Sequence, residues 1–114
     1  MTITGIGVDI ENISRFRETP FESNELFYRK IFTDEEIFYC LIKSDPYPHF
    51  AVRFSAKEAF VKALKINNET NVIDYKSVKI IKEGFQPFIE YKNNRYLLSL
   101  SHDTDKSIAF VVIQ

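Results

Sequence analysis

The sequence predicts a single α+β domain over residues 1–114, in which an N-terminal strand and several helices precede an antiparallel strand meander. Its 114 residues suit one domain, because domains commonly have roughly 100 to 200 residues. Hydrophobic residues recur with a helical period between residues 23 and 65 and with a period of two from residue 75. Short turns join these later segments, which favours antiparallel pairing of neighbouring strands.

The first predicted strand begins at Gly5. Isoleucine or valine at positions 6, 8 and 10 alternates with Gly5, Gly7 and Asp9, and this period is typical of a strand. Asp9 is therefore expected to point away from the apolar side. The Gly-x-Gly before Asp9 allows the backbone to pass close to another group.

Three helices are expected next, after a helical turn at residues 13–17. The first covers residues 23–32, and the second begins at Thr33, because Thr33 and Glu36 form a capping-box pattern. The second is expected to run to about residue 44, where Asp45 and two prolines interrupt it. Residues 49–65 contain no glycine or proline and form the longest predicted helix. After a polar stretch, strands are expected at residues 75–82, 88–91, 95–101 and 107–113, with turns at 83–87, 93–94 and 103–106.

Composition argues against several function classes. The 15 basic and 16 acidic residues give a formal net charge of -1, so no overall positive field favours nucleic acid or an anionic membrane. No apolar run approaches the roughly 18 to 20 residues of a membrane span, and residues 1–11 carry no basic leader. Cys40 is the single cysteine, which leaves no internal disulfide and no paired-cysteine zinc site. We expect a soluble cytoplasmic protein.

The longest helix places four charged residues among phenylalanine and alanine side chains, namely Arg53, Lys57, Glu58 and Lys62. At about 100° per residue, Glu58 and Lys62 share one flank, Arg53 lies on the other, and Lys57 falls on the apolar stripe. On an exposed face, Glu58 and Lys62 would form an ordinary surface ion pair. On an enclosed helix these charges would need an ion or a phosphate as compensation. One carboxylate beside several cations suits a magnesium-bound pyrophosphate.

Two residues outside this helix are further candidates. Asp9 stands near a strand end, where it is either a turn or cap carboxylate or part of a site. His102 ends a predicted strand, and a single histidine is more often a structural hydrogen-bonding residue than a catalytic one. Cys40 is expected to be buried. No arrangement of Ser, Cys or His indicates covalent catalysis.

Three motifs follow one another along the chain: Gly5-Ile-Gly-Val-Asp9-Ile-Glu, Arg53-Phe-Ser-Ala-Lys57-Glu58-Ala-Phe-Val-Lys62-Ala and Leu100-Ser-His102. In this order and separation they resemble holo-acyl-carrier-protein synthase, the short bacterial type of 4′-phosphopantetheinyl transferase. The resemblance covers the whole chain, including a Gly84-Phe-Gln-Pro87 turn before a strand. It implies transfer of 4′-phosphopantetheine from coenzyme A to a serine of apo-acyl carrier protein, with release of adenosine 3′,5′-bisphosphate.

The resemblance also implies roles for the candidate residues. Asp9 and Glu58 would coordinate Mg²⁺ on the coenzyme A pyrophosphate and, with Lys62, form the catalytic group. Lys62 would face that pyrophosphate, and further contacts to the coenzyme phosphates are implied for Arg53, Lys57 and His102. The base that removes the serine proton stays open between Glu58, a metal-bound water and a solvent-exposed base.

The resemblance implies two partners for the chain. One is further copies of itself, in a homotrimer whose active site lies between subunits. The other is the acidic carrier protein, for which Arg15 and Arg17 are candidate contacts, with Arg29 and Lys30 as lesser ones; each is otherwise a solvated surface cation. Residues 67–70 replace a glycine-containing turn usual in the family, and Glu69 there would repel a phosphate.

Two other classes of function are compatible with the sequence. The main alternative is a non-enzymatic oligomeric homologue that binds coenzyme A or a carrier protein. A nucleic-acid-binding module is a more distant one, because the sequence has no basic stripe and no aromatic platform motif.

Overall fold

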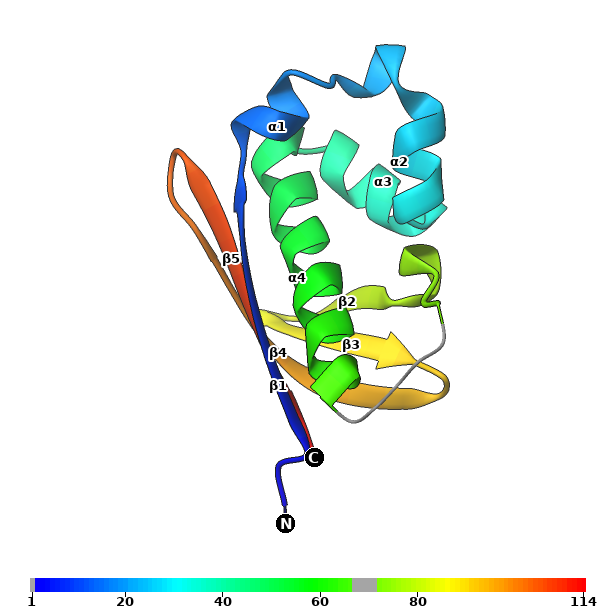
Figure 1. Ribbon diagram of the computed structural model, residues 1–114. Coiled ribbons are helices and arrows are strands. Elements are labelled where there is room, and N and C mark those ends of the chain that lie inside the picture. Colours follow the sequence, from blue (N-terminus) through cyan, green and yellow to red (C-terminus); the bar gives the residue numbers. More distant parts are fainter. Residues whose placement is uncertain (1, 67–71) are drawn as a thin grey trace.

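The fold of the computed structural model, which describes residues 2–66 and 72–114, is one five-stranded antiparallel sheet with helices packed on it (Figure 1). The sheet order is β1-β5-β4-β3-β2, and the predicted α+β class is confirmed. In chain order the elements are β1 (Gly5–Asn12), α1 (Ser14–Arg17), η1 (Phe21–Ser23), α2 (Glu25–Ile31), α3 (Asp34–Leu41), α4 (Pro46–Ile66), η2 (Tyr75–Ser77), β2 (Lys79–Glu83), β3 (Gln86–Tyr91), β4 (Asn94–His102) and β5 (Lys106–Ile113).

Several element boundaries differ from the predicted ones; the predicted helix 23–32, for example, is divided between η1 and α2. The capping box of α3 is confirmed, but the helix ends at Leu41 instead of near residue 44. Helix α4 begins at Pro46, because the first turn of a helix tolerates a missing backbone donor. The start of the predicted strand 75–82 is the short helix η2, where the Asp74 carboxylate accepts a hydrogen bond from the Lys76 backbone N–H. Residues 67–70, where the sequence lacks the glycine-containing turn usual in the family that it resembles, lie outside the described residues.

Gly7 brings α4 directly against β1. A Cβ atom at Gly7 would lie 1.9 Å from the backbone oxygen of Ala59, so only glycine allows this approach. Asp9 does lie on the opposite side of β1 from Ile6, Val8 and Ile10. The covered side, however, is the one with the glycines and Asp9, which is 8% exposed, whereas Ile10 is 59% exposed. The strand therefore turns its carboxylate, and not its apolar row, towards the helix.

Two hydrophobic clusters hold the elements together. One lies between α4 and the sheet, around Phe60, Ile89 and Val111. The other gathers aromatic rings beneath α1 to α3, where Tyr28 contacts Phe50 with ring centroids 4.7 Å apart. Cys40 is buried there, as predicted. None of the helices within residues 2–66 and 72–114 combines the length and apolar character needed to span a membrane.

Candidate active site

Asp9 and Lys62 meet where β1 passes under α4. The Lys62 ammonium donates to Asp9 Oδ1 at 2.9 Å and to the Val8 carbonyl at 3.2 Å. Asp9 Oδ2 is buried and has no hydrogen-bond partner among residues 2–66 and 72–114. A buried carboxylate oxygen without a donor is costly, so this atom is poised to accept a cation or a proton donor.

Glu58 and Glu11 bring two more carboxylates to the same place. The charges of Asp9, Glu58 and Glu11 together raise the pKa of Lys62, with the Asp9 hydrogen bond as the largest cause. Burial raises the pKa of Glu11 to about 7, and the hydrogen bond and charge of Asp9 add to the rise. Burial also raises the pKa of Tyr75, as do a hydrogen bond to Glu58 and the charge of Glu58. The three acids therefore share one small region with one lysine, and we call Asp9, Glu11, Glu58 and Lys62 the acidic cluster.

The acidic cluster fits a hard divalent cation. Its donor atoms are carboxylate oxygens, the type that Mg²⁺ prefers, and no described residue donates a hydrogen bond to Asp9 Oδ2. No three acidic, histidine or cysteine side chains in the described part of the chain are arranged to hold a metal ion by themselves. A cation here would therefore take its remaining ligands from water or a bound phosphate, which is usual for Mg²⁺.

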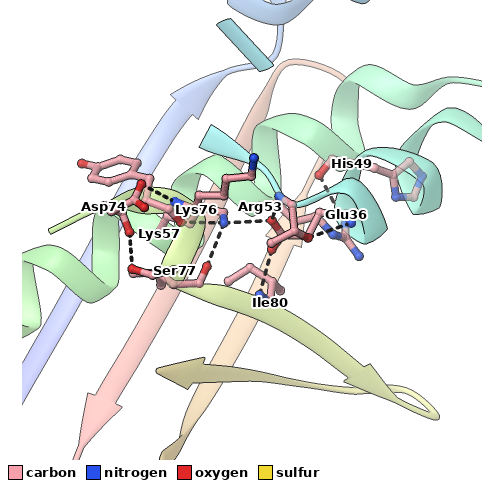
Figure 2. Close-up of polar contacts among 11 residues, drawn as sticks. Glu36, His49, Arg53, Lys57, Asp74, Lys76, Ser77 and Ile80 are labelled. Atoms are coloured by element: carbon pink, nitrogen blue, oxygen red, sulfur yellow. Dashed lines mark hydrogen bonds and ion pairs between the residues drawn. The ribbon is translucent and has the colours of Figure 1, made fainter. Parts of the chain in front are cut away.

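Lys57 points away from this cluster, and its ammonium is bound by groups of the protein itself. Its side chain is 0% exposed, and its ammonium donates to Glu36 Oε1 at 2.9 Å and to the carbonyls of Tyr75 and Val78 at 2.8 Å each (Figure 2). Glu36 Oε2 in turn accepts from the Ile80 backbone N–H at 2.8 Å. Glu36 and two backbone carbonyls thus compensate the positive charge of the buried lysine. Lys57 is therefore a structural residue that links α3, α4 and β2.

Replacing Lys57 with methionine is expected to lower the free energy of unfolding by about 3 to 5 kcal/mol, because Glu36 would keep a buried charge without its partner. Urea unfolding of the purified variant measures this loss. Adding Glu36→Gln should recover part of it, since the amide carries no charge. A single variant that loses less than about 1 kcal/mol would contradict the structural role.

Arg53 and His102 line the same cavity, which is separate from the acidic cluster. They line a cavity of about 400 Å³ between α3, the start of α4 and the sheet, with His49, Lys82 and Tyr39 among the other lining residues. None of the described residues that line it is acidic. We call this the cationic cavity, and its composition suits an anion.

Sequence reasoning missed most of the cationic cavity. His49 was not among the predicted site residues, yet it lines this cavity and its ring centroid lies 6.2 Å from that of His102. Burial lowers the pKa of His49, and the positive charges of Arg53, Lys43, His102 and Lys82 lower it further. His49 and Arg53 share α4, but Lys82 comes from β2 and His102 from β4, and no local pattern links these elements. No signal in the sequence could therefore have predicted that these residues line one cavity.

On one small α+β domain, the acidic cluster offers oxygen donors of the type that a divalent cation prefers. The cationic cavity, which has no acidic residue among its described lining, suits a phosphorylated ligand. These features are typical of proteins that bind phosphorylated ligands, and comparison with known proteins agrees with this class. Residues 5–111 match the model of the 4′-phosphopantetheinyl transferase superfamily. The chain is 36% identical to holo-[acyl-carrier-protein] synthase of Syntrophotalea carbinolica, over 98% of this chain and 96% of the relative. It is 38% identical to the enzyme of that name from Chloroherpeton thalassium, over 96% of each chain.

Solved structures show the same fold. Holo-[acyl-carrier-protein] synthase from Neisseria meningitidis superposes with a TM-score of 0.82 at 28% identity, over 99% of both chains. The Helicobacter pylori enzyme, solved in complex with coenzyme A, gives a TM-score of 0.80 at 26% identity, over 96% of this chain and 99% of that one. The chain therefore belongs to the 4′-phosphopantetheinyl transferase superfamily and is an enzyme of that class.

Proposed function

We propose that this enzyme transfers 4′-phosphopantetheine from coenzyme A to a serine of apo-acyl carrier protein, giving holo-acyl carrier protein and adenosine 3′,5′-bisphosphate. The observation that carries the proposal is the gathering of Asp9, Glu58 and Lys62 at the crossing of β1 and α4. The relatives named for this reaction and the coenzyme A complex of the Helicobacter pylori protein support it. The cytoplasm suits a chain whose single cysteine is buried and unpaired.

In this reaction the serine oxygen forms a bond to the phosphorus that carries pantetheine. The bond from that phosphorus to the oxygen of adenosine 3′,5′-bisphosphate breaks, and the serine proton is lost. Asp9 and Glu58 would hold Mg²⁺, which when bound supplies charge neutralisation to the pyrophosphate. The Lys62 ammonium, more than half exposed, is free to turn from Asp9 to a pyrophosphate oxygen. The residue that accepts the serine proton stays open.

The coenzyme is proposed to span two copies of the chain. Arg53 and Glu58 are five residues apart on α4, so at about 100° per residue they point roughly 140° apart. The residues lining the cationic cavity include none of the acidic cluster. Coenzyme A would then lie between the acidic cluster of one copy and the cationic cavity of the next, in a homotrimer.

The outer face of the sheet supports such self-association. Val8 pairs with Phe110 and Ile10 with Ile108 across β1 and β5. All four side chains are at least 40% exposed. A contiguous apolar sheet face of this kind commonly marks an interface between proteins, and we propose that neighbouring copies cover it.

The carrier protein is proposed to dock beside the acidic cluster. Arg15 is half-exposed and pairs with Glu11 at 3.0 Å, so it reaches the cluster from α1. Arg17 pairs with Asp45 at 2.7 Å, and Arg29 pairs with Asp34 at 3.1 Å. An acidic partner would compete for these guanidinium groups, most directly for Arg15.

A transfer assay tests the proposed function. With coenzyme A, Mg²⁺ and an apo-acyl carrier protein, mass spectrometry of the carrier should show the added phosphopantetheine, and removal of Mg²⁺ with EDTA should stop the reaction. Arg15→Ala should raise the KM for the carrier about tenfold and leave kcat within twofold. The matched control is Arg95→Ala on β4, which should change neither constant. Coenzyme A binding without any transfer would instead favour the non-enzymatic homologue.

A further inference from the structure

Arg53 is a nearly buried cation without a carboxylate partner in the described ranges. Arg53 is 5% exposed, and its guanidinium donates a hydrogen bond to the His49 carbonyl of its own helix, at 3.3 Å (Figure 2). A buried guanidinium normally needs a counter-ion, because desolvation of its charge is costly. Another group must therefore stabilise Arg53 in the absence of a ligand.

The ring of Tyr39 is that group. The Arg53 Cζ atom lies 4.1 Å from the centroid of the Tyr39 ring, within the range of a cation–π interaction. Lys43 Nζ lies 4.5 Å from the same centroid, so one ring attracts two cations. Tyr39 itself projects from α3 and lines the cationic cavity together with Arg53.

An aromatic ring and a carboxylate have different effects on the net charge beside Arg53. A carboxylate beside Arg53 would cancel its charge and repel an anionic ligand. The ring stabilises the guanidinium through its quadrupole and leaves the net positive charge intact. Partial burial opposes ionisation of Tyr39, yet the nearby charges and hydrogen bonds of Arg53 and Lys82 lower its pKa. Tyr39 therefore interacts electrostatically with the cations around the cavity.

We propose that Tyr39 is a positioning residue that holds Arg53 in the cationic cavity, ready for a phosphate group of coenzyme A. The inference rests on the proposed function and deepens it, because it assigns a task to a residue that touches neither the reacting atoms nor the acidic cluster. Tyr39 acts through Arg53 and Lys43, and its hydroxyl is secondary to its ring.

Calorimetric titration with adenosine 3′,5′-bisphosphate tests this role, since the compound carries the coenzyme phosphates without the reacting pantetheine. Tyr39→Leu should weaken binding about tenfold, because the leucine side chain offers no π face to Arg53. Tyr39→Phe, the matched control, keeps the ring and should bind within about threefold of the unchanged protein. In transfer assays, Tyr39→Leu should raise the KM for coenzyme A by a similar factor and leave kcat nearly unchanged.

The outcomes separate this inference from the proposed function. If the unchanged protein binds the bisphosphate and Tyr39→Leu binds it equally well, the positioning role is wrong while the proposed function stands. If the unchanged protein does not bind it, both are wrong. Tyr39→Met replaces the leucine variant if circular dichroism shows that the latter is unfolded, and the same tenfold loss is expected. A fall in kcat without a change in KM would also overturn the inference.

Discussion

Asp9→Asn and Glu58→Gln are each expected to lower the rate of phosphopantetheine transfer by about a thousandfold or more. Both substitutions keep the shape of the side chain and remove the charge that a divalent cation requires. A thousandfold loss corresponds to about 4 kcal/mol of lost transition-state stabilisation, a reasonable size when a metal that neutralises the pyrophosphate is no longer held. Both variants should keep the far-ultraviolet circular dichroism of the unchanged protein.

Glu11→Gln is the matched control for this prediction. Glu11 belongs to the acidic cluster and interacts with Asp9 and Arg15, but the proposal does not make it a metal ligand. Its substitution should therefore cost less than about tenfold in rate. Steady-state assays over a range of Mg²⁺ concentrations compare the three variants. A full magnesium-dependent rate for Glu58→Gln would show that the metal assignment is wrong.

Gly7→Ala is expected to have the largest effect on stability, with a loss of about 4 kcal/mol or more in the free energy of unfolding. The added Cβ would stand 1.9 Å from the backbone oxygen of Ala59, and neither backbone can move away without separating β1 from α4. The same displacement would pull Asp9 away from Lys62, so activity should fall as well.

Gly84→Ala is the control for the loss at Gly7. Gly84 has a φ of 60°, and a Cβ atom there would meet nothing within 4 Å. Its replacement should cost only about 1 to 2 kcal/mol, from the left-handed backbone. Urea unfolding of the two variants gives both values. A Gly7→Ala loss of the same size as the control would mean that α4 does not depend on this close approach.

The sequence predicted the fold class because its periodicities are strong and local. The capping box at Thr33 needs only residues three apart, and α4 needs only a long run of good helix formers. The covered face of β1 was harder to predict. Three apolar side chains alternate with the glycines and Asp9, and a period of two says nothing about which face a helix will cover. The Gly-x-Gly before Asp9 was the useful signal, because it marked a close backbone approach.

The sequence allowed single candidate residues of the site to be predicted. It did not allow prediction of which residues from different helices and strands lie together. The helix position of Lys57 placed a charge on an apolar stripe, and the family resemblance implied a phosphate as its partner. Its real partner, Glu36, stands 21 residues earlier along the chain and was recognised only for its capping role. The cationic cavity joins residues of α3, α4, β2 and β4, and no local sequence pattern predicts such tertiary contacts.

The central claim is that Asp9 on β1 and Glu58 on α4 hold one divalent cation together. Electron paramagnetic resonance of Mn²⁺ in the presence of coenzyme A, without carrier protein, tests it most directly. Either single variant, Asp9→Asn or Glu58→Gln, should lose nearly all of the binding, and the double variant should be no worse than the singles, because both side chains serve the same ion. Independent losses that add up in the double variant, or full binding by either single variant, would contradict the claim.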